Sequence, residues 1–119
     1  MKDDRLILVA QPIPSDRPTT LRFKHRYDFE STWDGGVLEI SVNGGAFADA
    51  GSRIVSGGYD AALRSSANPL QTRSAWTGQL SSMTLVTVDL AGLEGASVRF
   101  MWRLGCDASV GAAGWNVDD

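Results

Sequence analysis

The sequence has little cysteine or histidine, with one residue of each. Cys106 therefore has no partner for a disulfide within the chain, and the Cys/His sets that hold zinc are missing. A catalytic thiol needs a nearby base, but His25 is distant from Cys106 in the sequence. We expect Cys106 to be a small buried residue at a strand end, and we expect the chain not to be an enzyme.

Long apolar and basic runs are also missing. The longest apolar stretch, residues 6–10, is far shorter than the roughly 20 residues that span a membrane. No signal peptide follows Met1, so we expect any export signal to lie outside this chain. With 11 basic and 14 acidic residues the net charge is −3, which argues against nucleic acid and anionic membranes as partners.

No segment of eleven or more residues carries a helical apolar stripe. Apolar and polar residues instead alternate, which is typical of half-buried strands. The alternating segments are residues 21–27, 37–42, 83–90 and 98–104, with shorter ones at 6–9, 53–56 and 115–117. Asn43-Gly44-Gly45 predicts a hairpin turn. The pattern predicts an all-β fold, a sandwich of two antiparallel sheets in a single domain over residues 1–119.

Two stretches are less regular. Residues 57–71 are long for a hairpin loop, so we expect them to cross between the sheets or to form a binding loop. Residues 115–119 form only the beginning of a predicted strand, and a strand edge without a pairing partner promotes aggregation. We expect the chain to be a fragment of a larger exported protein, or this end to pair with another chain.

Several groups of residues carry a family resemblance. They are residues 21–30, 33–41 and 43–45, then Arg73-Ser74-Ala75-Trp76-Thr77-Gly78, then 103–107 and 114–119. In order and spacing they resemble the MAM-like jelly-roll modules of secreted bacterial metallopeptidases of the immune inhibitor A and fungalysin types. The resemblance implies a secreted or cell-surface β-sandwich without an active site, often with a structural calcium ion.

The chain departs from that family in two places. Asn43 stands where the family commonly has aspartate, and the chain ends at Asp118-Asp119 where members continue with an apolar strand. The peptidase motif His-Glu-x-x-His is absent, so any protease activity of a parent protein does not come from this piece.

Acidic residues in loops and at strand ends point to calcium, which takes six to eight hard oxygen ligands. The candidate ligands are Glu30, Asp34, Asp107, Asp118 and Asp119. Neighbouring strands at residues 21–27 and 115–119 would bring the first and last of them together. The alternative is that each carboxylate caps a turn or bonds local backbone.

Trp33 lies in a predicted loop and is the best candidate for an exposed tryptophan. We expect Trp102 to be a core residue, and Trp76 and Trp115 to have structural roles beside glycines. An exposed indole can stack on a sugar, so Trp33 is the candidate ligand-binding residue of a carbohydrate-binding module. We expect His25 to be packed and hydrogen-bonded to a carboxylate.

The sequence therefore predicts a non-catalytic extracellular accessory module that contacts neighbouring domains of a parent protein and binds calcium. Two alternatives remain open. One is a carbohydrate-binding module, and the other is an adhesion or protein-interaction domain that adds a partner strand at an open sheet edge.

Overall fold

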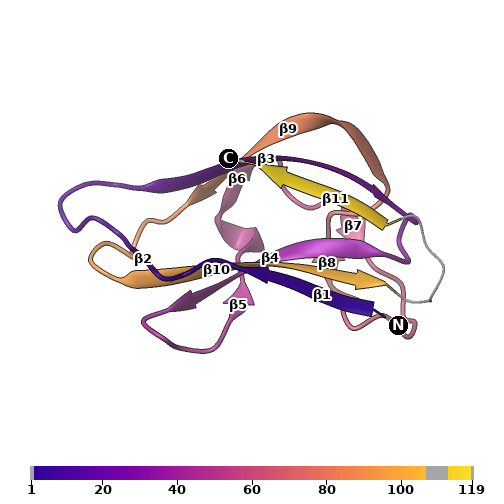
Figure 1. Ribbon diagram of the computed structural model, residues 1–119, viewed down its shortest axis with the longest axis horizontal. Helices are drawn as coiled ribbons and strands as arrows, with labels where there is room; N and C mark the ends of the chain where they lie inside the picture. The colour runs from indigo at the N-terminus through magenta and orange to yellow at the C-terminus, as the bar shows by residue number, and fades with distance from the viewer. Residues whose placement is uncertain (1, 107–112, 119) are drawn as a thin grey trace.

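The computed structural model describes residues 2–106 and 113–118 and shows an antiparallel β-sandwich (Figure 1). Sheet A has the order β1 (Lys2–Ile7), β10 (Ser97–Cys106), β4 (Gly35–Val42) and β5 (Ala48–Asp49), and β2 (Gln11–Pro12) pairs with the start of β10. Sheet B has the order β11 (Ala113–Asp118), β3 (Thr20–Phe29), β9 (Gln79–Asp89) and β6 (Ile54–Ser56). The prediction of an all-β, two-sheet antiparallel sandwich is confirmed.

The core between the sheets follows from the alternation in the sequence. In β3, Phe23, His25, Tyr27 and Phe29 are buried, while the cationic residues between them are exposed. β10 and β9 contribute Val98, Phe100, Trp102, Val86 and Val88 to the same cluster. Period-two segments thus place one apolar face of each sheet against the other.

The predicted turn after β4 is also confirmed. Asn43 and Gly44 have φ values of 51° and 78°, and the Gly45 amide donates to the Val42 carbonyl at 2.9 Å. Asparagine and glycine tolerate this left-handed geometry at low cost. The loop then returns the chain to β5, which pairs with β4.

A second layer covers the outer face of sheet A, and this layer was not predicted. The short strands β7 (Ala61–Ala62) and β8 (Ser74–Ala75) pair within it. Leu63, Leu70 and Ala75 pack on Val37 of β4 as a second apolar cluster. Glu39 and Ser41 are consequently buried, at 6% and 2% exposure, although alternation had placed them on a polar face.

Buried Asn68 fixes this layer to the strand ends of sheet A. Its amide group donates to the carbonyls of Trp33 at 2.7 Å and Gly105 at 2.9 Å, and its side-chain oxygen accepts from the Leu70 amide at 2.7 Å. Residues 57–71 thus leave β6 in sheet B and reach the outer face of sheet A, so the predicted crossing between the sheets is found.

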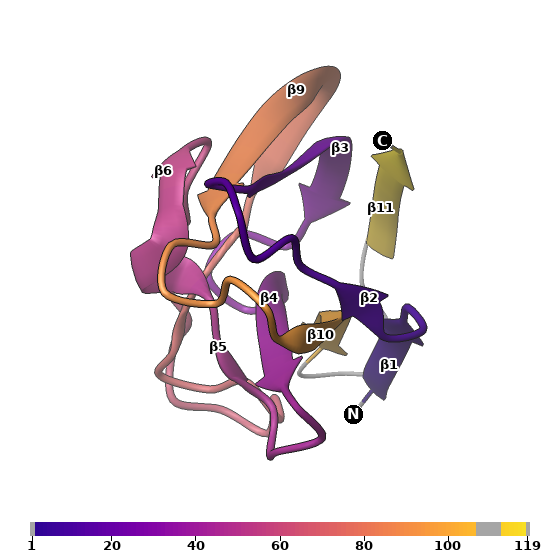
Figure 2. The same cartoon turned by 90° about the vertical axis from the view of Figure 1, so that its left-hand side faces the viewer.

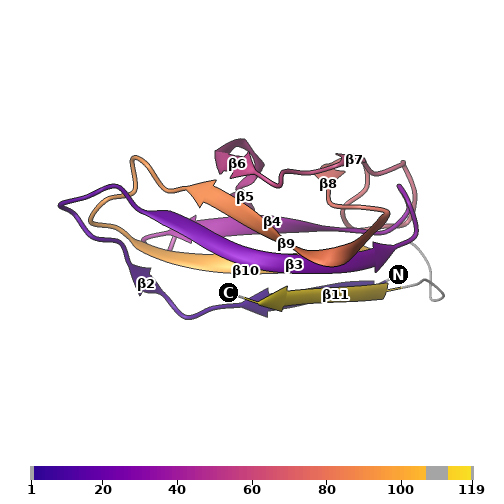
Figure 3. The same cartoon turned by 90° about the horizontal axis from the view of Figure 1, so that it is seen from above.

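The opposite side of the sandwich is open. β1 and β11 are the end strands of their sheets in the described chain, and both lie on the same side of the molecule (Figures 2 and 3). β1 begins earlier than the apolar run suggested, and its ladder extends to Leu8, whose amide donates to the Phe100 carbonyl at 3.0 Å.

Candidate functional site

A groove of about 550 Å³ lies between β1 and β11. Leu6, Trp102 and Leu104 line it from sheet A, and Trp115 and Val117 line it from sheet B. The polar residues Asp4, Arg5 and Asn116 complete the lining. Its lining is a mixture of polar and apolar surface, and the groove is open to solvent.

The walls of the groove continue the core of the sandwich. Trp102 belongs to the buried cluster, and Leu104, Trp115 and Val117 are partly buried against it. Trp115 lies directly on the backbone of β4, because a Cβ atom at Gly36 would come within 2.6 Å of its ring. Glycine is therefore required at this position for the indole to form the groove wall.

Four consecutive apolar residues lie at the edge of sheet A, and the first of them, Leu6, lines the groove. Leu6, Ile7, Leu8 and Val9 are 54%, 40%, 38% and 75% exposed. Because successive strand side chains point to opposite faces, Leu6 faces the groove and Ile7 faces the outer side of the sheet.

The edge also presents free backbone groups. The Leu8 amide bonds to Phe100 of β10, and in an antiparallel ladder such residues alternate with residues whose N–H and C=O point the other way. The backbone groups of Leu6 and Asp4 therefore face β10, whereas those of Ile7 and Arg5 face away from the sheet.

One side chain in the groove wall has an unsatisfied donor. The indole nitrogen of Trp102 is buried and has no hydrogen-bond partner among the described residues. Buried tryptophan N–H groups usually find an acceptor, so this nitrogen is an exception within a well-bonded core.

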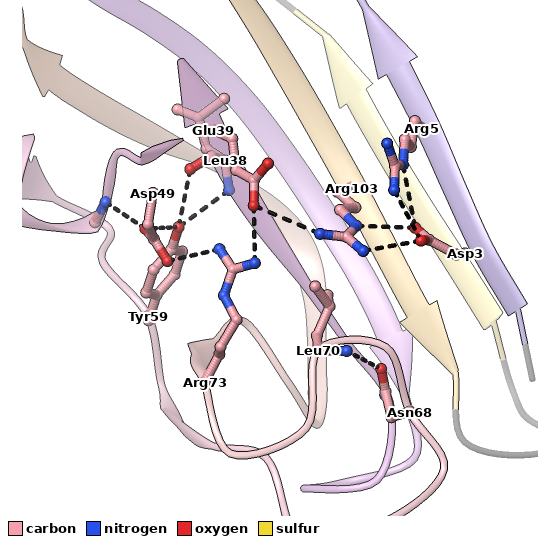
Figure 4. Close-up of polar contacts among 11 residues, drawn as sticks. Asp3, Arg5, Leu38, Glu39, Asp49, Tyr59, Asn68, Leu70, Arg73 and Arg103 are labelled. Carbon is pink, nitrogen blue, oxygen red and sulfur yellow. Dashed lines mark hydrogen bonds and ion pairs between the residues drawn. The ribbon is translucent and has the colours of Figure 1, made fainter. Parts of the chain in front are cut away.

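Ion pairs on the outer face hold β1 in place beside the groove (Figure 4). The Arg103 guanidinium donates two hydrogen bonds to the Asp3 carboxylate, both at 2.9 Å, and Arg5 adds a contact of 3.1 Å. The Arg103 hydrogen bonds, together with Arg5, lower the pKa of Asp3 to about 2. A bidentate pair of this kind fixes the position of β1 on β10.

The same network ties the covering layer to β4. Arg73 contacts the carboxylates of Glu39 at 2.8 Å and Asp49 at 2.9 Å. The Tyr59 hydroxyl donates to Asp49 at 2.8 Å and accepts from the Leu38 amide at 3.0 Å. Burial raises the pKa of Tyr59. Because cations and carboxylates pair throughout, we interpret this network as structural.

His25 is packed as predicted, but its partner is not the expected carboxylate. The residue is 1% exposed, and its Nδ1 accepts a hydrogen bond from the Trp115 indole at 3.1 Å. Burial lowers the pKa of His25 to about 4, with Asp60 opposing the shift. The imidazole is therefore neutral at pH 7 and positions Trp115 in the groove wall.

The predicted calcium ligands are not all brought together. Asp34 is buried before β4, and its amide donates to the Glu30 carbonyl at 2.9 Å, so these two residues share one turn. β11 does pair with β3, but Asp118 lies opposite Lys24, five positions from Phe29. At about 3.3 Å per residue, Asp118 is roughly 16 Å along the strand from that turn.

Asp107 and Asp119 lie outside the described residues. Within residues 2–106 and 113–118, no group of three acidic, histidine or cysteine side chains is arranged to hold a metal ion. Glu30 and Asp34 share a turn and Asp118 lies away from it, and calcium binding itself stays a prediction.

Calcium binding at this turn predicts a change in thermal stability. At a hundredfold excess over its dissociation constant, calcium is expected to add about 2.7 kcal/mol to the free energy of unfolding. Melting curves in calcium, in magnesium and in EDTA measure this effect, and Asp34→Asn is expected to remove it. An identical melting temperature in calcium and EDTA would contradict the prediction.

Trp33, the predicted carbohydrate-binding residue, is half-buried. The Arg64 guanidinium lies 5.1 Å from its ring centre and is held by a 2.8 Å hydrogen bond to Thr32. One face of the indole is thus covered by a cation–π contact. Trp76 is buried and Trp115 lines the groove, so these residues do not form a shared flat aromatic platform with Trp33.

No family model, curated protein or solved structure matches the chain. The resemblance to MAM-like modules therefore stays a prediction. In the described ranges, none of the helical structure is long and apolar enough for a membrane span.

Sequence reasoning missed the groove as a site. Leu104 and Val117 were interpreted as strand core, and Leu6 was only part of a short apolar run. The sequence did contain one signal. Residues 6–9 are all apolar, whereas an edge strand with one face in solvent normally alternates apolar and polar residues.

Proposed function

We propose that this β-sandwich is a non-catalytic accessory module of a larger secreted protein and that it binds a protein partner through the groove between β1 and β11. The observation that carries the proposal is the groove itself, where core residues such as Trp102 and Trp115 lie beside the exposed side chain of Leu6. Covering this surface would remove apolar area from water, which is the main driving force of protein association.

The other features of the molecule support a binding role over a catalytic one. His25 is neutral and bonded to an indole, and the Glu39 carboxylate is paired with Arg73. These groups stabilise the two walls and the covering layer. The assignment to a secreted parent protein rests on the family resemblance alone.

Selection from a random peptide library displayed on phage tests the proposed function. Selected peptides are expected to bind Leu6→Glu about tenfold or more weakly, because a buried unpaired charge opposes binding in the groove. Val55→Glu is the matched control, since Val55 is 66% exposed on β6 at the other edge of the sandwich. Circular dichroism checks that both variants fold.

A glycan array run in parallel separates the carbohydrate-binding alternative. Glycan hits that are lost in Trp33→Ala, combined with an empty peptide selection, would contradict the proposal. Peptides that bind Leu6→Glu as well as the unchanged chain would place the binding surface elsewhere and would also contradict it.

A further inference from the structure

We infer that the occupant of the groove is a single extended peptide strand that pairs antiparallel with the free edge of β1. This inference rests on the proposed function and adds the class of partner, its direction and its register. Its support comes from the backbone of β1, the residues in the groove and the charges on the outer face.

The backbone argument starts from the edge geometry. The N–H and C=O groups of Arg5 and Ile7 point away from β10, and β1 pairs with no further strand in the part of the chain that the structure describes. Donor and acceptor pairs repeat every second residue, or about every 7 Å. An extended peptide matches this repeat and bonds to both pairs, as in other cases of strand addition.

The side-chain argument follows from the register. Leu6 lies opposite Trp102 in the β1–β10 ladder and lines the groove. In an added strand, the residue opposite Leu6 and those two positions away point to the same face. These residues lie beside Leu6 at the mouth of the groove, so apolar side chains are favoured there.

The charge argument concerns the outer face. Arg5 and Arg103 both contact the carboxylate of Asp3. Arg103 also lies 3.7 Å from the Glu39 carboxylate, whereas the Arg5 side chain remains 49% exposed beside the free edge. An acidic residue opposite Arg5 in the added strand complements this charge. The occupant is therefore an extended strand with apolar residues on one face and an acidic residue on the other.

A synthetic peptide of the sequence Val-Thr-Leu-Glu-Thr-Ser, acetylated and amidated at its ends, tests this inference. Its leucine is placed opposite Leu6 and its glutamate opposite Arg5. The titration is followed by ¹⁵N NMR of the full chain. The peptide is expected to shift the indole signals of Trp102 and Trp115 and to leave that of Trp33 in place.

Two N-methylated peptides separate strand pairing from simple apolar contact. Methylation of the glutamate nitrogen and of the threonine nitrogen before leucine removes the two donors that face β1. Affinity is expected to fall about tenfold or more, the loss from two ordinary hydrogen bonds. Methylation of the leucine nitrogen, which points away from β1, is the matched control and is expected to retain binding.

A protein variant tests the same edge from the other side. Ile7→Pro removes a donor that faces away from β10, so it costs no hydrogen bond within sheet A. It is expected to weaken peptide binding about tenfold, whereas Ile7→Val is expected to bind as before. Melting curves verify that both variants are folded.

Failure of the inference is distinguishable from failure of the proposed function. Equal binding of the doubly methylated peptide, no binding of the unmodified one, or a shift of Trp33 alone would overturn strand addition. A chain that forms a dimer through β1 without peptide, measured by sedimentation, would also overturn it, because the occupant would be a second copy. In each case the library selection still decides whether the groove binds a partner.

Discussion

Replacing Trp76 with alanine is expected to lower the free energy of unfolding by about 3–5 kcal/mol. Trp76 is 1% exposed, and its ring centre lies 4.7 Å from both His25 and Tyr59 in edge-to-face contacts. Its indole also donates to the Gly57 carbonyl at 2.8 Å. Alanine removes all of these contacts and leaves a cavity between the core and the covering layer.

Urea unfolding followed by circular dichroism measures this effect. A loss of this size is a large fraction of the total stability of an ordinary domain, so the variant is expected to be partly unfolded at 37 °C. Trp33→Ala is the matched control and is expected to cost far less, because Trp33 is half-buried. Equal losses for the two variants would show that the Trp76 cluster does not stabilise the core.

Protonation of His25 is expected to produce the second large effect. Burial lowers the pKa of His25 from 6.5 to about 4 in the folded chain. Between pH 4 and pH 6.5 the unfolded chain therefore binds a proton that the folded chain excludes. Stability is fully present above pH 6.5 and falls as the pH drops through this window, by about 3 kcal/mol at pH 4.

His25→Gln isolates this contribution. Glutamine does not titrate, and its side-chain oxygen is able to accept the Trp115 N–H bond that His25 Nδ1 accepts. Urea unfolding at several pH values is expected to show a shallower decline for the variant between pH 6.5 and pH 4. The ion pair of Asp3 contributes separately, because its pKa is lowered to about 2 and its stabilisation is lost below roughly pH 4. Parallel stability curves for the two chains would contradict a neutral buried His25.

The sandwich was predictable because its central strands follow the simplest pattern. In β3 the alternation of Phe23, His25 and Tyr27 with cations fixes which face is buried, and the structure confirms it. β9 and β10 were located for the same reason. The turn at Asn43 was identified from residues that tolerate positive φ. Local pattern was sufficient in β3 because one of its faces is buried and the other is exposed, whereas consecutive residues of β10 such as Met101 and Trp102 are both buried.

The covering layer and the groove depend instead on contacts between distant residues. Glu39 is polar by sequence, but it is buried because Arg73, 34 positions later, reaches its carboxylate. The partner of His25 lies 90 positions away, in β11. Sequence periodicity carries no information on which strand edges remain open, so neither the groove nor the separation of Asp118 from Asp34 was predicted.

The position of β10 has a consequence for synthesis of the chain. β10 pairs with both β1 and β4, and about ninety residues separate it from β1 in the chain. During translation, about ninety further residues are therefore synthesised before β10, the pairing partner of β1, leaves the ribosome. In this interval the apolar strand is exposed and can mispair or aggregate, and the risk increases with the length of the interval. A chaperone or a neighbouring segment that shields β1 during translation would protect the same edge that the folded chain leaves open.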